Sequence, residues 1–189
     1  LGIARDNMDS VLSKLRRGLA TDALITSGGA SWGDYDLIRL VLENKGRVVC
    51  STSTIGGGGL FTFGLLNSGF EPDAAPNIPV FALPGSPSGC LINFEMLVKP
   101  ALFKLLGHRS FERPQVEAEA LDSFPGSRKT AVLKWSKLEK NNGTAKVRLK
   151  SPDECGMFAS IAAANSLTLL PGGTRTNSGD TMQVVPLDW

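Results

Sequence analysis

The 189 residues are enough for one or two domains with a sizeable core. Lysine and arginine together number 20 and aspartate and glutamate 18, so the net charge is only +2. This argues against a protein that binds nucleic acid mainly by attraction to the charged phosphate backbone. A hydrophobic share of 42% and a charged share of 20% are typical of a folded globular chain. No apolar run approaches the roughly 20 residues that span a bilayer, so we expect no membrane segment.

The first residues of the chain and its few cysteine and histidine residues exclude further classes of protein. The chain opens at Leu1 with neither a methionine nor a signal-peptide pattern, so we expect it to be a piece of a longer protein. Cys50, Cys90 and Cys155 are odd in number and form no Cys-x-x-Cys pair, which argues against a zinc site. We interpret them as buried free thiols of a cytoplasmic protein. A single histidine, His108, excludes a multi-histidine metal site.

The first stretch predicts a helix and then a strand. Apolar residues recur at helical spacing over residues 8–19, and Asp6 or Asn7 can cap that helix. The apolar run 23–25 predicts a buried strand, and the glycine- and serine-rich residues 27–34 predict a loop after it.

A second helix and strand follow. Asp34 or Tyr35 begins a helix that runs to about residue 44, and Gly46 ends it. Residues 48–50 predict a strand. The inner face of the helix is expected to carry Leu37, Leu40 and Val41.

Two further strands and a long helix complete the first half. Residues 60–65 and 79–83 predict strands separated by a surface excursion. A tight loop over 84–89 leads into an apolar helix to about residue 106, which Pro100 should kink. The core stripe of this helix is expected to be Phe94, Leu97, Val98, Ala101, Leu102 and Leu105.

The periodicity changes after a linker at 107–114. Alternating segments predict a β-rich region, and Asn141-Asn142-Gly143 is a strong hairpin signal. The expected strands cover residues 116–121, 130–138, 144–150, 167–170 and 182–185. We therefore predict two domains, an α/β domain over residues 1–108 with a mostly parallel sheet, and a small β-rich domain over residues 109–189.

Two loops of the α/β domain suit an anion. Ligands of parallel sheets bind beyond the carboxyl ends of the strands, and both loops follow predicted strands. Glycine-rich turns there expose backbone N–H groups to phosphate or another oxyanion, and serine hydroxyls add donors. A purely structural turn is the alternative for either loop alone. The candidate binding residues are Ser27, Gly28, Gly29, Ser31, Pro84, Gly85, Ser86 and Pro87.

Two carboxylates follow the first loop. Asp34 can cap the next helix, whereas Asp36 lies two positions on and could face the mouth of the loop. A carboxylate beside a phosphate site often implies a bridging Mg²⁺. Ser86 lies in no Gly-x-Ser-x-Gly frame, and Gly56–Gly59 lacks the Lys-Ser/Thr of a P-loop, so a serine hydrolase and a nucleoside triphosphatase are not expected.

Collinear motifs along nearly the whole chain resemble the MoeA and gephyrin E-domain family. They are Leu-Gly-Ile-Ala-Arg-Asp at 1–6, Ile-Thr-Ser-Gly-Gly-Ala-Ser-Trp-Gly-Asp-Tyr-Asp at 25–36, Phe-Ala-Leu-Pro-Gly-Ser-Pro at 81–87, Phe-Glu-Met-Leu-Val-Lys-Pro-Ala-Leu at 94–102, and Ala-Ala-Ala-Asn-Ser-Leu at 162–167.

The resemblance implies a fold and an activity. Family members are molybdopterin molybdenumtransferases, which insert molybdate into adenylylated molybdopterin in a Mg²⁺-dependent reaction that releases AMP. They are elongated homodimers of four-part subunits that act on a small molecule. This chain would cover most of the three-layer molybdopterin-binding domain and the small β-barrel domain. The first two parts and the opening strand of the third would be absent.

The resemblance also assigns roles by position. The loops at 27–29 and 84–87, with Ser31 and Asp34, would hold the phosphate end of molybdopterin. Asp36 matches the family's acidic active-site position and would be both the catalytic and the metal-binding residue.

This sequence departs from the family pattern at several positions: Thr130 stands where the family has an arginine, Ser86 is a mild change from the asparagine of Pro-Gly-Asn-Pro, and two whole segments differ. Gly56-Gly57-Gly58-Gly59-Leu60 stands where the family usually has Lys-Pro-Gly-Lys-Pro, and residues 153–158 stand where it has a Ser-Ser-Arg segment. A lysine is a natural partner for molybdate or phosphate, whereas glycine offers only backbone donors. Two alternatives therefore stay open, a non-catalytic paralogue that binds molybdopterin or the finished cofactor, and a gephyrin-like scaffold module.

Overall fold

The computed structural model describes residues 1–28, 37–52, 60–70, 76–124, 130–141, 143–150, 156–173 and 175–187. These residues form two compact units, the first ending at Phe94 and the second beginning at Glu95. The division lies inside a helical stretch, whereas the sequence predicts a boundary after residue 108. No described helix is long and apolar enough to cross a membrane.

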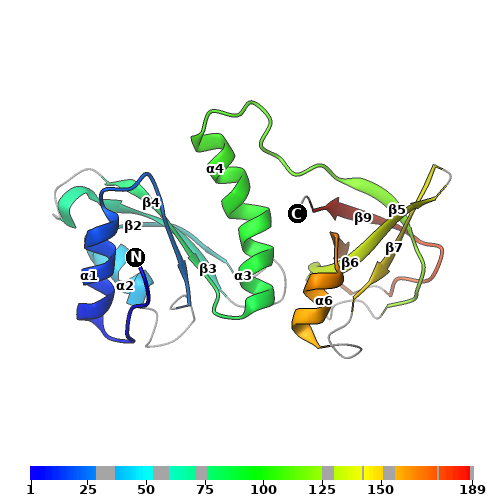
Figure 1. Ribbon diagram of the computed structural model, residues 1–189, viewed down its shortest axis with the longest axis horizontal. Coiled ribbons are helices and arrows are strands. Elements are labelled where there is room, and N and C mark those ends of the chain that lie inside the picture. The colour runs from blue at the N-terminus through cyan, green and yellow to red at the C-terminus, as the bar shows by residue number, and fades with distance from the viewer. Residues whose placement is uncertain are drawn as a thin grey trace. The chain divides into compact units, whose positions relative to one another are not determined.

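The first unit contains a four-stranded sheet in the order β1-β4-β3-β2 (Figure 1). Its α-helices and strands are α1 (Met8–Gly18), β1 (Leu24–Ser27), α2 (Leu37–Lys45), β2 (Gly46–Thr52), β3 (Phe61–Asn67), β4 (Pro76–Leu83) and α3 (Pro87–Asn93). A 3-10 turn, Ser68–Phe70, follows β3.

The α/β class is confirmed, but the sheet is mixed rather than mostly parallel. β1 and β4 pair in parallel, whereas β3 pairs with β4 and β2 pairs with β3 in antiparallel fashion. A parallel pair needs a crossover of about a dozen residues or more. The links at 53–60 and 68–75 contain fewer residues than that, which agrees with the antiparallel pairing of the strands that they join.

The core of the first unit lies between the sheet and helices α1 and α2. Asn7 caps α1 by accepting a 2.9 Å hydrogen bond from the Ser10 N–H, as predicted. On α2 the expectation for Leu40 is wrong, because Leu40 is 39% exposed. Ile38, Val41 and Leu42 share one helical face and enter the core instead.

The helical stretch after β4 is irregular where a kink is expected. α3 is followed directly by a π-helical turn, Phe94–Val98, and then by α4 (Lys99–Leu105). Pro100 has no N–H, and in a regular α-helix its ring would clash with the carbonyl four residues back. The helix therefore widens into a π-helical turn before Pro100. Of the residues predicted to form the core stripe of this helix, Val98 is fully buried, which confirms the prediction, whereas Leu105 is 56% exposed and the prediction for it is wrong.

The second unit contains a closed five-stranded barrel in the order β5-β7-β6-β8-β9. The strands are β5 (Val116–Ala120), β6 (Val132–Asn141), β7 (Thr144–Leu149), β8 (Ser166–Leu170) and β9 (Thr181–Pro186), and a helix, α6 (Met157–Ala163), precedes β8. Asn141 pairs with Thr144, which confirms the predicted hairpin. The expected small β-barrel-like region is therefore present.

The interpretation of the cysteines as buried thiols is wrong for Cys50, which is exposed. β2 is an edge strand with a register shift between Val48 and Cys50, and no strand covers its outer side in the described part of the sheet. Cys90 is half-buried, and Cys155 lies outside the described residues.

Gly46 illustrates how closely the elements of the first unit pack. A Cβ added there would overlap the backbone carbonyl oxygen of Leu65 on the neighbouring strand. Only glycine therefore allows α2 to end and β2 to begin at this point.

We expect Gly46→Ala to lower the free energy of unfolding by about 2 kcal/mol, because β2 or β3 must shift to admit the methyl group. Urea denaturation of the two proteins measures this difference. Gly85→Ala is the matched control, since the one described atom that its Cβ would meet is Gly28 Cα at 3.6 Å, an ordinary contact. Equal losses of unfolding free energy in the two variants would contradict the conclusion that only glycine fits at residue 46.

A buried ion pair ties the π turn to the segment before β5. Glu95, whose side chain is 5% exposed, pairs with Arg113, whose side chain is 9% exposed. The Lys99 ammonium lies 3.5 Å from the same carboxylate, and Arg113 Nε donates to the Glu95 carbonyl oxygen at 3.4 Å. Because the two ions are desolvated, each depends on the other.

We expect Glu95→Leu to lower the free energy of unfolding by about 3 kcal/mol, because a buried guanidinium loses its carboxylate. The double variant Glu95→Leu/Arg113→Leu should recover much of the loss. Urea denaturation again gives both values, and a single variant as stable as the parent would show that the pair contributes nothing.

Candidate functional site

Parallel pairing places the ends of β1 and β4 at the same edge of the sheet. Ser27, the last residue of β1, lies in register with Leu83, the last residue of β4. The loops that follow these strands therefore begin side by side, which is the adjacency that the sequence pattern predicts for an anion site.

The two loops approach each other through glycines. Gly28 adopts a positive φ of 84°, and its N–H donates to the Leu83 carbonyl oxygen at 3.0 Å. A Cβ on Gly85 would lie 3.6 Å from Gly28 Cα, so the two backbones pass with no side chain between them. Such an arrangement lets a ligand reach main-chain groups directly.

Ser27 contributes both a hydroxyl and a backbone donor to this edge. Its side chain is exposed. N–H groups alternate in direction along a strand, and the Gly28 N–H is directed at β4. The Ser27 N–H therefore points the other way, towards the open side of β1.

The second loop leads straight into a helix. Pro84 is buried, Gly85 and Ser86 are exposed, and Pro87 is the first residue of α3. The Cys90 N–H donates to the Ser86 carbonyl oxygen at 2.8 Å and closes the first turn. The start of a helix carries partial positive charge, which favours an anion nearby.

Sequence reasoning missed one member of this group. Cys90 Sγ lies 3.6 Å from Ser27 Oγ and donates a hydrogen bond to it. The signal was available, since Cys90 stands four residues after Ser86 and so lies on the same helical face, one turn on.

Four predicted site residues lie outside the described residues, namely Gly29, Ser31, Asp34 and Asp36. Within the described ranges, no group of three or more His, Cys, Asp and Glu side chains could hold a metal ion. The described part of the site therefore consists of backbone donors and hydroxyls.

A cavity of about 390 Å³ runs along the open side of β1. β4 is the only strand of the described sheet that pairs with β1, so this side is a sheet edge. Thr26 lines the cavity, and its buried Oγ1 has no hydrogen-bond partner among the described residues. The other lining residues are Leu1–Asp6, Val11, Lys14, Leu15, Leu24, Ile25, Ser27, Gly28, Leu37 and Ile38.

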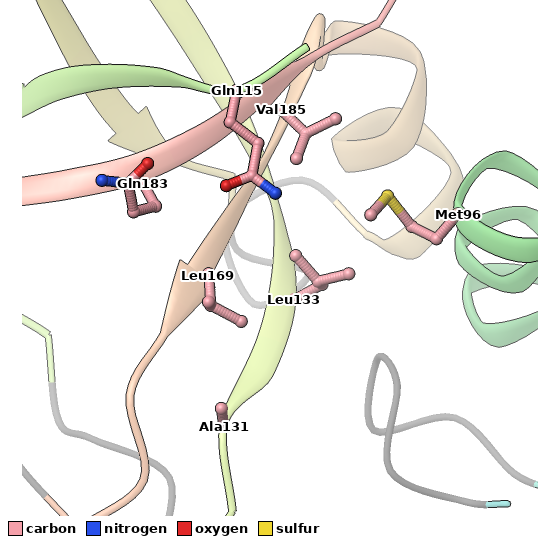
Figure 2. Close-up of a pocket in the computed structure, with 7 residues that line it drawn as sticks. All are labelled: Met96, Gln115, Ala131, Leu133, Leu169, Gln183 and Val185. Carbon is pink, nitrogen blue, oxygen red and sulfur yellow. The ribbon is translucent and has the colours of Figure 1, made fainter. Parts of the chain in front are cut away.

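The second unit has a pocket of a different kind, with a volume of about 290 Å³ (Figure 2). Its lining consists of Met96, Gln115, Ala131, Leu133, Leu169, Gln183 and Val185. Gln115 and Gln183 are the two polar side chains of this lining and the other five are apolar, so the pocket offers phosphate or molybdate few donors. The edge formed by β1 and β4 is the better anion site.

The described residues define what this edge can do. Ser27, Gly28, Gly85 and Ser86 offer neutral donors at fixed positions, and none of them titrates near neutral pH. The edge can bind and orient an oxyanion, whereas acid–base or metal chemistry would need further groups.

Curated relatives match the chain along nearly its whole length. It is 28% identical over 188 residues to the molybdopterin molybdenumtransferase of Bacillus subtilis, covering 98% of this chain and 42% of that protein. It is 25% identical over 186 residues to that of Staphylococcus epidermidis, covering 97% of this chain and 42% of the relative. The chain thus spans about two fifths of their length.

Solved structures give the same match. The molybdopterin biosynthesis MoeA protein from Pyrococcus horikoshii aligns with a TM-score of 0.74 and 26% identity, over 100% of this chain and 43% of that one. A molybdenum cofactor biosynthesis protein from Pyrococcus furiosus shares the fold, with a TM-score of 0.66 and 21% identity, over 98% of this chain and 56% of that one.

The model of one protein family covers more than half of the chain. It matches residues 1–104, and it describes a "Probable molybdopterin binding domain". Those residues include β1, β4 and both loops of the candidate site. The chain therefore belongs to this family of molybdopterin-binding domains.

Proposed function

We propose that the edge formed by β1 and β4 binds the phosphate end of molybdopterin. We further propose that the longer protein inserts molybdate into adenylylated molybdopterin with release of AMP. The observation that carries the proposal is that the Ser27–Gly28 and Pro84–Pro87 segments begin side by side, so close that a Cβ on Gly85 would touch Gly28 Cα. Membership of a molybdopterin-binding family supplies the ligand class.

The proposed roles follow from the donors that each residue offers. The hydroxyls of Ser27 and Ser86 and the turn at Gly28 would contact phosphate oxygens, with Gly29, Ser31 and Asp34 completing the first loop. Gly85 keeps the approach open, and Pro84 and Pro87 fix the entry into α3.

Asp36 is the proposed catalytic residue. Its carboxylate would hold Mg²⁺ against the phosphates, and the cation would supply neutralisation of the negative charge that builds on them. This chain's part in the reaction is otherwise positioning, since the loops fix the phosphate end while the dithiolene and molybdate meet.

We propose that the site is completed by parts of the longer protein. The relatives are more than twice as long as the matched region. The open side of β1, with its cavity and the unpartnered Thr26 hydroxyl, is consistent with further polypeptide packing there. A homodimer in the cytoplasm is the assembly and location that the family resemblance favours.

One feature favours the non-catalytic alternative. Gly56–Gly59 lacks the lysines that the family pattern places there. Removing one partner of a charged pair from a desolvated site costs about 2–5 kcal/mol. Binding of molybdopterin without molybdate-dependent AMP release would therefore distinguish a cofactor-binding paralogue from a transferase.

We expect the chain to bind molybdopterin, measured by pterin fluorescence, and Ser27→Ala to weaken binding about tenfold, because the variant cannot donate a hydrogen bond to a charged oxygen. Asp36→Ala should weaken binding in the presence of Mg²⁺ more than in its absence. Ser110→Ala, in an exposed segment before β5, is the matched control. A folded chain that does not bind molybdopterin would contradict the proposal.

The lysine-free segment makes a second outcome testable. With adenylylated molybdopterin, molybdate and Mg²⁺, we expect the full-length parent to release AMP slowly, and replacement of Gly56 and Gly59 by lysine to accelerate release at least tenfold. Chromatography of the nucleotide products measures the rate. If the two lysines leave the rate of AMP release unchanged, the glycines at these positions do not slow the reaction, and the expectation is wrong.

A further inference from the structure

The contact between Cys90 and Ser27 has no role in the function proposed above. The two residues come from different elements, Ser27 from the end of β1 and Cys90 from the first turn of α3. Their side chains meet at 3.6 Å, with Sγ as donor and Oγ as acceptor. Cys90 is half-buried and Ser27 is exposed, so the pair lies at the rim of the anion site.

The direction of this hydrogen bond decides what Ser27 can offer a ligand. A serine hydroxyl has one hydrogen and two acceptor lone pairs. If the hydroxyl donated to the sulfur, its hydrogen would be unavailable to a phosphate oxygen. Because Cys90 donates instead, it occupies a lone pair of Oγ, and the hydroxyl hydrogen is left to point at the anion.

We propose that Cys90 is a positioning residue that orients the Ser27 hydroxyl as a donor to the oxyanion. The ligand's identity as molybdopterin rests on the proposed function, whereas the orientation applies to any oxyanion bound between the two loops. Cys90 itself needs no contact with the ligand.

Packing alone explains the contact less well. Cys90 is only half-buried, so its side chain fills little core volume. The buried residues of α3 are Gly89, Ile92 and Asn93. The polar partner that the thiol meets within its donor range is Ser27.

The test is a double-mutant cycle on Ser27 and Cys90, with inorganic phosphate and molybdopterin titrated separately. Phosphate binding is followed by the amide resonance of Gly28, and molybdopterin binding by pterin fluorescence. We expect Cys90→Ala to weaken both about threefold, and Cys90→Ser, which keeps a donor, to stay within about twofold of the parent. In the Ser27→Ala background, Cys90→Ala should change neither affinity.

Cys50→Ala is the matched control, since Cys50 is an exposed thiol on β2, at the opposite edge of the same sheet. It should leave both affinities unchanged. Thermal unfolding of each variant identifies any general loss of structure, and rescue by Cys90→Ser separates the effect of the missing donor from that of poorer packing.

The outcomes distinguish the two proposals. Phosphate binding that shows the coupling, without molybdopterin binding, would refute the proposed function and support the role of Cys90. Tight molybdopterin binding that Cys90→Ala leaves unchanged, or weakens equally with and without Ser27, would overturn the role of Cys90 alone. A chain that binds neither ligand would overturn both.

Discussion

The candidate site depends on the parallel pairing of β1 with β4. Because of this pairing, β1 ends at Ser27 and β4 ends at Leu83 in the same register. Two loops that are far apart in the sequence therefore leave the sheet side by side. The Gly28 N–H then bonds to the Leu83 carbonyl oxygen and anchors the first loop to the end of β4. A side chain larger than hydrogen at Gly85 would project towards Gly28 and begin to fill the space where the loops converge.

The site as described relies on neutral donors rather than on charge. In the proposed binding mode, backbone N–H groups, serine hydroxyls and the start of α3 would attract an anion through dipoles that the fold holds in place. Such donors cost little to organise on binding, since strands β1 and β4 already fix them. They cannot replace a lysine where a second anion must be neutralised, which is why phosphate binding and molybdate insertion are separable questions for this chain.

Local signals in the sequence predict most elements, because they depend on periodicity and on capping. The Asn7 cap and the Asn141–Gly143 hairpin are examples, and both reflect hydrogen bonds within a few residues. The family resemblance is also confirmed by the match to residues 1–104. Pairing direction is harder to predict, since alternation of helices and strands suggests a parallel sheet even where the links at 53–60 and 68–75 are too short for a crossover.

Contacts between distant residues explain what sequence reasoning missed. The residue type alone suggests a buried thiol at Cys90. Its spacing from Ser86 places it on the same helical face, but only the parallel register of β1 and β4 brings Ser27 to it as a partner. Glu95 and Arg113 form a similar case, because a carboxylate on an apolar helix suggests a surface residue until its arginine is found beside it. In both cases, the residue type suggests the wrong environment because the stabilising partner comes from another element.

The helical stretch from α3 to α4 begins in the first unit and ends in the second, and each unit places a different requirement on it. α3 must begin immediately after the proposed anion-binding loop at 84–87, whereas Glu95 must face Arg113, which also belongs to the second unit. A regular α-helix through Pro100 would leave a carbonyl without a donor and a ring in contact with it. The π turn at Phe94–Val98 absorbs that conflict and changes the angular position of every later side chain. The start of α3 can therefore be set by the site while the rest of the helix follows the packing of the second unit.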